Sequence, residues 1–327
     1  ARLKRSSAAR AFKMLSLLVS LPSLTTAPAT NTALVFIKPH AATDAWEGYI
    51  KKHLSSSGIR IIDSGVKYAA EIDSNRLIDQ HYGSLARLAV ETQPAEMELS
   101  SSAKKSFADT FGVEWDAALG SVLRNDAALA KLGVDGAALE ALWRQGDTCK
   151  LAPGTYVSRL AGQASDAPLY TVNGFYPAMR EAFVADGAEV RYLVCEFEED
   201  VLSWRAFRRD VIGATDPEAA ADGSARAALR ASWEELGLDA APSTGNNGVH
   251  ASAGPLEGLK ERCVWAGATL ESDAFAQQLL AAGLERATLE DWLDTNPVVT
   301  LEGKTDKVFD LTEEMSAAEV LRAVASR

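Results

Sequence analysis

Short apolar runs and longer amphipathic stretches alternate along most of the 327-residue chain. Residues 32–37, Thr-Ala-Leu-Val-Phe-Ile, form an apolar and partly β-branched run that predicts a strand. Pro39 predicts the end of that strand, because proline cannot donate to a strand ladder. Residues 58–66 and 189–197 are also predicted strands, and residues 298–301 a predicted edge strand. The pattern indicates a protein that mixes helices with strands.

Helical spacing of apolar residues predicts most of the remaining elements. The predicted helices cover residues 46–54, 72–82, 201–210, 273–283, 289–293 and 316–326. Gly254-Pro255 predicts one more helix, because glycine can serve as an N-cap and proline is favoured at the first helical position. Glu257 then lies in the first turn, where the helix dipole favours an acid.

The charge balance restricts what the protein can bind. The chain has 33 Lys and Arg against 45 Asp and Glu, a formal net charge of −12 at pH 7. Nucleic-acid binding as the main task is disfavoured, since it requires a basic face. A pocket for an anionic nucleotide needs only a few local cations. No apolar run is long enough for a transmembrane segment. Cys149, Cys195 and Cys263 show neither metal-ligand spacing nor a disulfide framework.

Residues 1–30 are predicted to be a targeting or disordered segment. Basic residues precede the apolar run at 15–21, no acidic residue occurs before Asp44, and Ala27-Pro28-Ala29 resembles a small-residue cleavage site. These features favour either a secretory signal or a transit peptide for a mitochondrion or plastid. The alternative is a start at Met14, in which case the protein would be cytoplasmic.

The strongest candidate for chemistry is His250, which lies among Asn, Gly and Ser residues just before the predicted helix start at Gly254-Pro255. Gly248 lets the backbone approach a bulky group. Glu261, further along the helix, is expected to reach one imidazole nitrogen. Such a hydrogen bond fixes the tautomer and leaves the other nitrogen free as a nucleophile. The alternative is a loop histidine without a chemical role.

This segment resembles the active-site stretch of nucleoside diphosphate kinases, Arg-Asn-x-x-His-Gly-Ser-Asp followed by a Glu on the next helix. The matching residues are Asn247, His250, Ser252 and Glu261. Ala251 replaces the Gly of the family, and Ala253 replaces the Asp. The second replacement removes a carboxylate beside the site, which bears on loop rigidity and metal handling.

Two further segments near the start of the chain resemble the same family. Phe36-Ile37-Lys38-Pro39 matches its first-strand motif, with His40 in the place of an Asp. Tyr82 aligns with its phosphate-proximal Tyr, although a half-buried aromatic would look the same. Phe175 matches the aromatic residue that stacks on the nucleotide base, and its alternative is a core Phe. Stacking on any base predicts weak base preference.

A further segment resembles the family motif Arg-x-x-x-Gly-x-Thr-Asn-Pro. The matching residues are Arg209, Gly213, Thr215 and Pro217, with Asp216 for Asn. Arg226 follows at the interval of a second phosphate-binding Arg. Two guanidinium groups and a hydroxyl that converge on an anion suit a polyphosphate. Structural ion pairs are the alternative for each Arg.

The resemblance implies an α+β, ferredoxin-like fold with an antiparallel four-stranded sheet, and phosphoryl transfer through a phosphohistidine at His250. The implied catalytic residues are His250, Glu261, Lys38, Tyr82 and Ser252. The implied nucleotide-binding residues are Lys38, Phe175, Arg209, Thr215, Arg226 and Asn247. Substrates would be nucleoside triphosphates and diphosphates, and Mg²⁺ would arrive bound to the nucleotide. The alternatives are a weakly active or inactive scaffold or nucleotide sensor, and a signalling protein that is only phosphorylated on His250.

The resemblance covers residues 31–82 and 173–267, and predicts a kinase-like domain over residues 31–267. Residues 83–172 are then an insertion, predicted to be helical from its Ala-rich amphipathic stretches. Residues 268–327 form a predicted, mostly helical extension. The insertion or the extension is expected to bind a protein partner. Together with a longer loop before Asn246, the added bulk predicts an oligomer smaller than the hexamer usual in the family.

Overall fold

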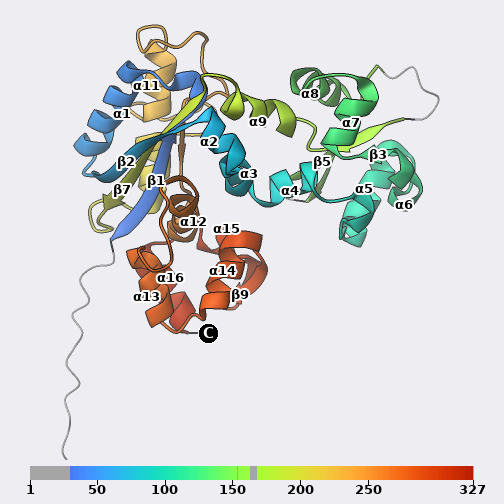
Figure 1. Ribbon diagram of the computed structural model, residues 1–327. Helices are drawn as coiled ribbons and strands as arrows, with labels where there is room; N and C mark the ends of the chain where they lie inside the picture. The colour runs from blue at the N-terminus through green and yellow to red at the C-terminus, as the bar shows by residue number, and fades with distance from the viewer. Residues whose placement is uncertain (1–29, 153, 163–167, 327) are drawn as a thin grey trace, which may run out of the picture.

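A four-stranded sheet forms the centre of the part of the molecule at the upper left of Figure 1, where its first two strands are drawn in blue. The computed structural model describes residues 30–152, 154–162 and 168–326, so the predicted targeting segment lies outside the described residues except for Thr30. The strands are β1 (Asn31–Ile37), β2 (Arg60–Tyr68), β7 (Glu189–Phe197) and β8 (Val249–Ala251), in the order β2-β7-β1-β8. Every neighbouring pair is antiparallel. The predicted α+β class with an antiparallel four-stranded sheet is confirmed.

Alternate residues of β1 support the two sides of the sheet. Val35 and Ile37 pack on one side with Trp46 of α1 (Asp44–Ser56) and Leu229 of α11 (Ala225–Ser232). Phe36 packs on the other side with Ile78 of α3 (Leu77–Tyr82), Phe183 of α9 (Tyr176–Val184) and Trp265 of α12 (Pro255–Trp265). Because successive strand residues point to opposite faces, this central strand is buried on both.

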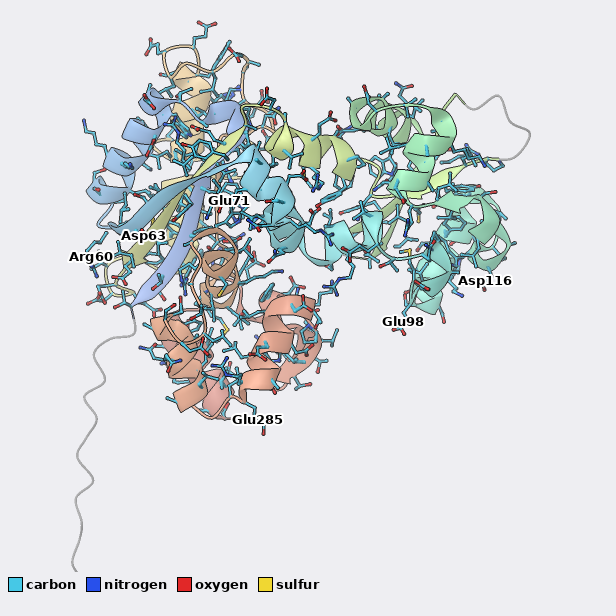
Figure 2. The ribbon with its side chains drawn as sticks, in the orientation of Figure 1. Arg60, Asp63, Glu71, Glu98, Asp116 and Glu285 are labelled. Carbon is cyan, nitrogen blue, oxygen red and sulfur yellow. The ribbon has the colours of Figure 1, made fainter. Side chains whose placement is uncertain are left out.

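The edge strand β2 is charged and irregular. Arg60 and Asp63 are exposed, and the register of β2 against β7 shifts between Ile61 and Asp63. Figure 2 shows Arg60, Asp63 and, beyond the strand, Glu71 along this border. Charges and bulges on an edge strand oppose pairing with another chain.

The predicted helix over residues 72–82 is broken into α2 (Ala69–Ser74) and α3. Arg76 between them has a left-handed backbone with φ of 54°. Buried Ile72, Leu77 and Ile78 all face the same core, so the apolar pattern continues through the break. The predicted helix over residues 201–210 is instead a short α10 (Trp204–Ala206) followed by a π-helical segment, η4 (Phe207–Ile212).

Residues 83–172 are not wholly helical, which corrects the prediction. The helices are α4 (Ser84–Val90), α5 (Ser101–Phe111), α6 (Trp115–Ala118), α7 (Asn125–Leu132) and α8 (Gly136–Gln145). A second sheet in the order β3-β6-β5-β4 comprises β3 (Val122–Leu123), β4 (Thr148–Ala152), β5 (Thr155–Arg159) and β6 (Tyr170–Val172). The strands have two to five residues, too few for a clear alternating pattern. This part extends to one side of the first sheet, and exposed Glu98 and Asp116 lie on it (Figure 2).

The last part of the chain packs beneath α12 in the view of Figure 1. Its elements are α13 (Ala274–Ala281), α14 (Arg286–Thr295), β9 (Val298–Leu301), β10 (Lys304–Lys307), α15 (Val308–Thr312) and α16 (Ala317–Ala325). Short 3-10 turns elsewhere are η1 (Pro39–Ala41), η2 (Pro94–Glu96) and η3 (Leu119–Ser121). Leu256 and Leu259 of α12 belong to the core of this last part, so α12 joins it to the sheet. The predicted edge strand at 298–301 is β9, paired with β10.

No helix among the described residues is both long enough and apolar enough to cross a membrane.

Candidate active site

His250 lies on β8, beside the central strand β1. Its Cα partner across the strands is Phe36, and the two rings stack with centroids 4.7 Å apart and planes 25° apart. His81, at the end of α3, meets the imidazole edge-on at 4.6 Å and 90°. The side chain of His250 is 22% exposed. The sheet and α3 therefore hold the ring on two sides and leave part of it accessible.

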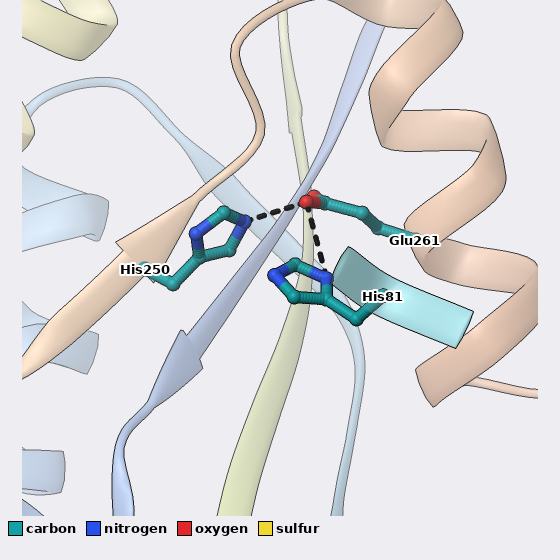
Figure 3. A group of neighbouring side chains, drawn as sticks. All are labelled: His81, His250 and Glu261. Atoms are coloured by element: carbon teal, nitrogen blue, oxygen red, sulfur yellow. Dashed lines mark hydrogen bonds and ion pairs between the residues drawn. The ribbon is translucent and has the colours of Figure 1, made fainter. Parts of the chain in front are cut away.

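Glu261 on α12 fixes the orientation of His250. The predicted helix start is confirmed, with Gly254 as N-cap and Pro255 at the first helical position. Glu261 is 2% exposed, and its Oε1 lies 2.6 Å from Nε2 of His250 (Figure 3). With Nε2 donating to the carboxylate, the lone pair of the imidazole is on Nδ1. No hydrogen bond to Nδ1 is found among the described residues.

Ser252 ties the carboxylate to the sheet. Its buried Oγ lies 2.5 Å from Oε2 of Glu261 and accepts a 2.8 Å hydrogen bond from the backbone N–H of Leu34. The same Oγ also lies 3.1 Å from the carbonyl oxygen of Leu34. Ser252 therefore positions Glu261 and does not face a ligand.

Ser252→Ala should lower the free energy of unfolding by about 1–3 kcal/mol, because it leaves the buried Leu34 N–H without an acceptor. Denaturant unfolding at neutral pH measures this loss. Ser55→Ala is a matched control, since the hydroxyl of Ser55 makes only an exposed bond to the Lys51 carbonyl. If Ser252→Ala lowers the free energy of unfolding no more than the control does, the buried hydrogen bond does not stabilise the fold.

Two neighbouring carboxyl groups compete for protons in the site. Burial raises the pKa of Glu261 to about 8, while hydrogen bonds from Ser252 and Glu257 oppose the rise. Burial and the charge of Glu261 raise the pKa of Glu257 to about 8. Glu261 receives the hydrogen bonds, which favours its charged form. We therefore assign the shared proton to Glu257 and the negative charge to Glu261.

The raised pKa of Glu257 predicts a loss of stability with rising pH. Near neutral pH the folded protein binds this proton and the unfolded chain does not, so stability is complete below the unfolded pKa of about 4.5 and falls as pH rises through about 8. One such proton contributes a slope of at most about 1.4 kcal/mol per pH unit. Denaturant unfolding between pH 6 and 9 should show a flatter profile for Glu257→Gln. Equal slopes for the variant and the unchanged chain would argue against this protonation.

Three cations lie close enough to His250 to lower its pKa. Burial, and then Lys38, Arg226 and Arg208, lower the pKa of His250 to about 3. Lys38 lies just after β1, and burial together with Arg226 lowers its pKa to about 8. Arg226 donates to the carbonyl oxygens of Gly213 at 2.7 Å and Val249 at 2.8 Å. No ion pair of Lys38 or Arg226 with a carboxylate occurs among the described residues, so both charges stay available to an anion.

The structure brings Arg208 to this cluster, whereas sequence spacing selected Arg209. The Arg209 side chain is 64% exposed and pairs with its neighbour Asp210 at 2.8 Å. Arg208 contributes to the lowered pKa of His250 and of Arg226. Both arginines lie in the π-helical segment η4, which has more residues per turn than an α-helix and therefore changes which side chain faces inward.

Phe175 does not lie beside His250 in the structure. Its ring packs edge-on against Trp143 at 5.3 Å, inside a cluster formed by α7, α8 and β5. The aromatic side chains that line the cavity at His250 are Tyr82 and Phe309. The base-stacking role inferred for Phe175 therefore has no support from its position.

Thr215 and Asn247 hold two loops together. Asn247 is 1% exposed and donates from Nδ2 to the Thr215 carbonyl oxygen at 2.9 Å. The buried Asn247 Oδ1 and Arg226 Nε have no hydrogen-bond partner among the described residues. Gly248, with φ of 79°, leaves space for Leu229, which a Cβ atom would hit. The bulky group expected at Gly248 is therefore part of the core.

A cavity of about 230 Å³ opens beside His250 and Glu261. Tyr82 and Lys260 line it, and burial and Glu261 raise the pKa of Tyr82 to about 12. Asn296 and Phe309 close it from the last part of the chain. Sequence reasoning missed His81, Arg208, Glu257 and Phe309. His81 is adjacent to Tyr82, Arg208 is adjacent to Arg209, and Glu257 was expected in the first turn of its helix, so only Phe309 had no signal in a recognised segment.

Comparisons with known proteins give no family assignment. No protein-family model matches the chain, and no curated protein is similar to it. Among solved structures, a nucleoside diphosphate kinase from Encephalitozoon cuniculi covers 73% of this chain and 90% of its own, at 16% identity and a TM-score of 0.35. An NDP kinase from Pyrobaculum aerophilum covers 74% and 98%, at 17% and 0.36. The Borrelia burgdorferi enzyme, with bound vanadate and ADP, covers 72% and 87%, at 13% and 0.31.

Overall similarity at this level does not establish a family. The function is therefore inferred from the chain's own side chains.

Proposed function

We propose that the protein transfers the γ-phosphoryl group of a nucleoside triphosphate to a nucleoside diphosphate through His250. The observation that carries this proposal is the state of the imidazole: Nε2 is held by buried Glu261 at 2.6 Å, and Nδ1 has no partner among the described residues. A neutral, oriented imidazole is a nucleophile, whereas an imidazolium is not. The surrounding cations keep the ring neutral and also attract an anionic substrate.

The reaction follows in two balanced steps. The Nδ1 lone pair attacks the γ-phosphorus, the bond to the β,γ-bridging oxygen breaks, and the diphosphate leaves with that electron pair. A terminal oxygen of a second diphosphate then attacks the phosphohistidine and returns the electron pair to Nδ1. Positioning and charge neutralisation carry most of the catalysis in phosphoryl transfer. Lys38, Arg226 and Arg208 are cations whose charge acts on His250.

Magnesium ions fit this site only as part of the substrate. Mg²⁺ prefers oxygen ligands. The carboxyl groups of Glu257 and Glu261 share a hydrogen bond, and Glu261 also bonds Ser252 and His250, so neither is free to bind a metal ion. When bound to the nucleotide, Mg²⁺ supplies neutralising charge on the phosphate oxygens.

The sheet order also supports a ferredoxin-like arrangement, which we propose for the part that contains the site. Numbered as the first to fourth strands of that part, β1, β2, β7 and β8 lie in the order 2-3-1-4, all antiparallel. We further propose that the chain assembles as an oligomer smaller than a hexamer, because the part formed by residues 83–172 adds bulk at one side of the sheet (Figure 1).

Formation of TTP from Mg·ATP and TDP tests the proposed reaction. The rates should follow ping-pong kinetics, because one site serves both half-reactions. Nucleotide binding without any TTP would instead indicate a sensor or scaffold. One contact favours the sensor or scaffold function. Arg208 pairs with Glu313 at 2.5 Å and Glu314 at 3.0 Å, so two carboxylates already neutralise the charge of this arginine.

A further inference from the structure

A second imidazole, His81, shares the buried carboxylate with His250. The side chain of His81 is 5% exposed, and its Nδ1 lies 3.5 Å from Oε1 of Glu261. The same oxygen lies 2.6 Å from Nε2 of His250. Figure 3 shows both rings directed at this one oxygen from different elements. Two nitrogens and one carboxylate oxygen therefore converge on a single point.

The Nδ1 atom of His81 lies close to two groups, the Glu261 carboxylate and the indole of Trp265. The indole N–H of Trp265 lies 3.3 Å from Nδ1 of His81, which makes Nδ1 an acceptor. This lone pair lies beside the Glu261 carboxylate, because Nδ1 is 3.5 Å from Oε1. A cation bound by both atoms would take the lone pair in place of the Trp265 N–H.

We propose that His81 Nδ1, His250 Nε2 and Glu261 form an inhibitory Zn²⁺ site. The three ligand atoms lie within 4.8 Å of one another. In a tetrahedral zinc site with bonds of about 2.0–2.1 Å, ligand atoms lie about 3.3 Å apart. The His81–Glu261 distance already fits, and the His250–Glu261 distance must widen by less than about 1 Å. The two histidine nitrogens must approach each other by at most about 1.5 Å. Two imidazoles and a carboxylate suit zinc and not Mg²⁺, which prefers oxygen ligands.

The cavity beside the three residues provides the fourth ligand position. Its volume of about 230 Å³ is large enough for a coordinated water molecule, and Glu257 and Lys260 line it as polar partners. The site then has three protein ligands and one open position, as in zinc sites that exchange ligands.

Zinc binding and phosphorylation exclude each other, and this consequence rests on the proposed function. Phosphorylation of Nδ1 requires its lone pair, with the ring proton on Nε2 and donated to Glu261. Zinc takes the Nε2 lone pair, so the single ring proton moves to Nδ1 and the nucleophile is lost. No proton leaves the ring in this step. A rise in free zinc would therefore stop transfer without any competition for the nucleotide.

Calorimetric titration of the full chain with Zn²⁺ tests the site without reference to activity. One ion should bind per chain. His81→Phe, which keeps a ring against Phe36 and Trp265, should weaken binding more than about 100-fold, above the range typical for loss of an outer-shell partner. His81→Gln serves as a second variant should the first fail to fold. His53→Gln is the matched control, because His53 pairs with the Val211 carbonyl outside the site. Absent binding, or equal affinity in His81→Phe, would overturn the proposal.

Labelling with γ-labelled ATP under buffered free zinc tests the inhibition. Zinc should suppress labelling of the unchanged chain in excess Mg²⁺, and the ratio of labelling with and without zinc should approach one in His81→Phe. Equal suppression in both would show that zinc acts elsewhere. Absence of label even without zinc would contradict the proposed function, and calorimetry would still decide the metal site.

Discussion

His250→Ala should abolish the transfer of label from γ-labelled ATP to the protein and the formation of TTP. In the proposed reaction the imidazole of His250 forms the bond to phosphorus, and its Nε2 lies 2.6 Å from Glu261. The variant should stay folded, since the His250 side chain is partly exposed, at 22%. Circular dichroism and denaturant unfolding check the fold. His53→Gln is the control for loss of a histidine distant from the site and should label normally.

Residual labelling of His250→Ala at a tenth of the unchanged rate or more would move the nucleophile to another residue. His81 would be the first candidate, because it faces the same carboxylate at 3.5 Å. Loss of the residual label in the double variant His81→Phe, His250→Ala would then assign that label to His81.

Arg226→Ala should weaken binding of nucleoside triphosphate by about 1–3 kcal/mol, or about 5- to 150-fold, through loss of a charged hydrogen-bonding partner. Arg226 has no carboxylate partner among the described residues, so its charge is available to phosphate. Binding of the uncharged nucleoside should change much less. Calorimetry with ATP and with adenosine separates the loss of charge from a general loss of structure.

Arg209→Ala is the matched control for this prediction. Its side chain is exposed and paired with Asp210, so nucleotide binding should stay within about twofold of the unchanged chain, in line with surface substitutions of at most about 0.5 kcal/mol. Arg208→Ala should weaken binding less than Arg226→Ala does, because Glu313 and Glu314 already pair with Arg208. A large effect of Arg209 and none of Arg208 would restore the assignment made from sequence spacing.

Local sequence patterns predicted the contact between His250 and Glu261 because the helix that carries Glu261 has a clear start, although the short strand β8 that carries His250 was not predicted. Gly254-Pro255 fixes that helix, and eleven positions separate the two side chains. The main strands were predictable for a similar reason, since β1 and β7 are long and apolar.

The inward-facing arginine was not predictable from spacing. Matching positions to a motif assumes constant turn geometry, and the π-helical segment η4 breaks that assumption between Phe207 and Ile212. The base-stacking role predicted for Phe175 lacks support for a different reason. The chain of residues 83–172 supplies Trp143 and its apolar neighbours, and these offer the ring a core in place of a ligand. Tertiary contacts decide both cases, and no local pattern records them.

Phe309 and the cavity at His250 depend on a part of the chain that lies about fifty residues beyond the site in sequence. Val308–Thr312 forms α15, and Phe309 reaches the cavity because α12 packs against that helix. Nothing in the polar sequence around it indicates chemistry. The base preference predicted from Phe175 therefore stays a prediction without a structural contact.

The most direct measurement of the central claim is the fate of label on His250. The chain incubated with Mg²⁺ and γ-labelled ATP should carry one acid-labile, base-stable phosphoryl group, located on His250 by peptide mass spectrometry. Addition of unlabelled TDP should then convert that label to TTP. Label on a different residue, or label on His250 that TDP does not remove, would contradict transfer through a phosphohistidine.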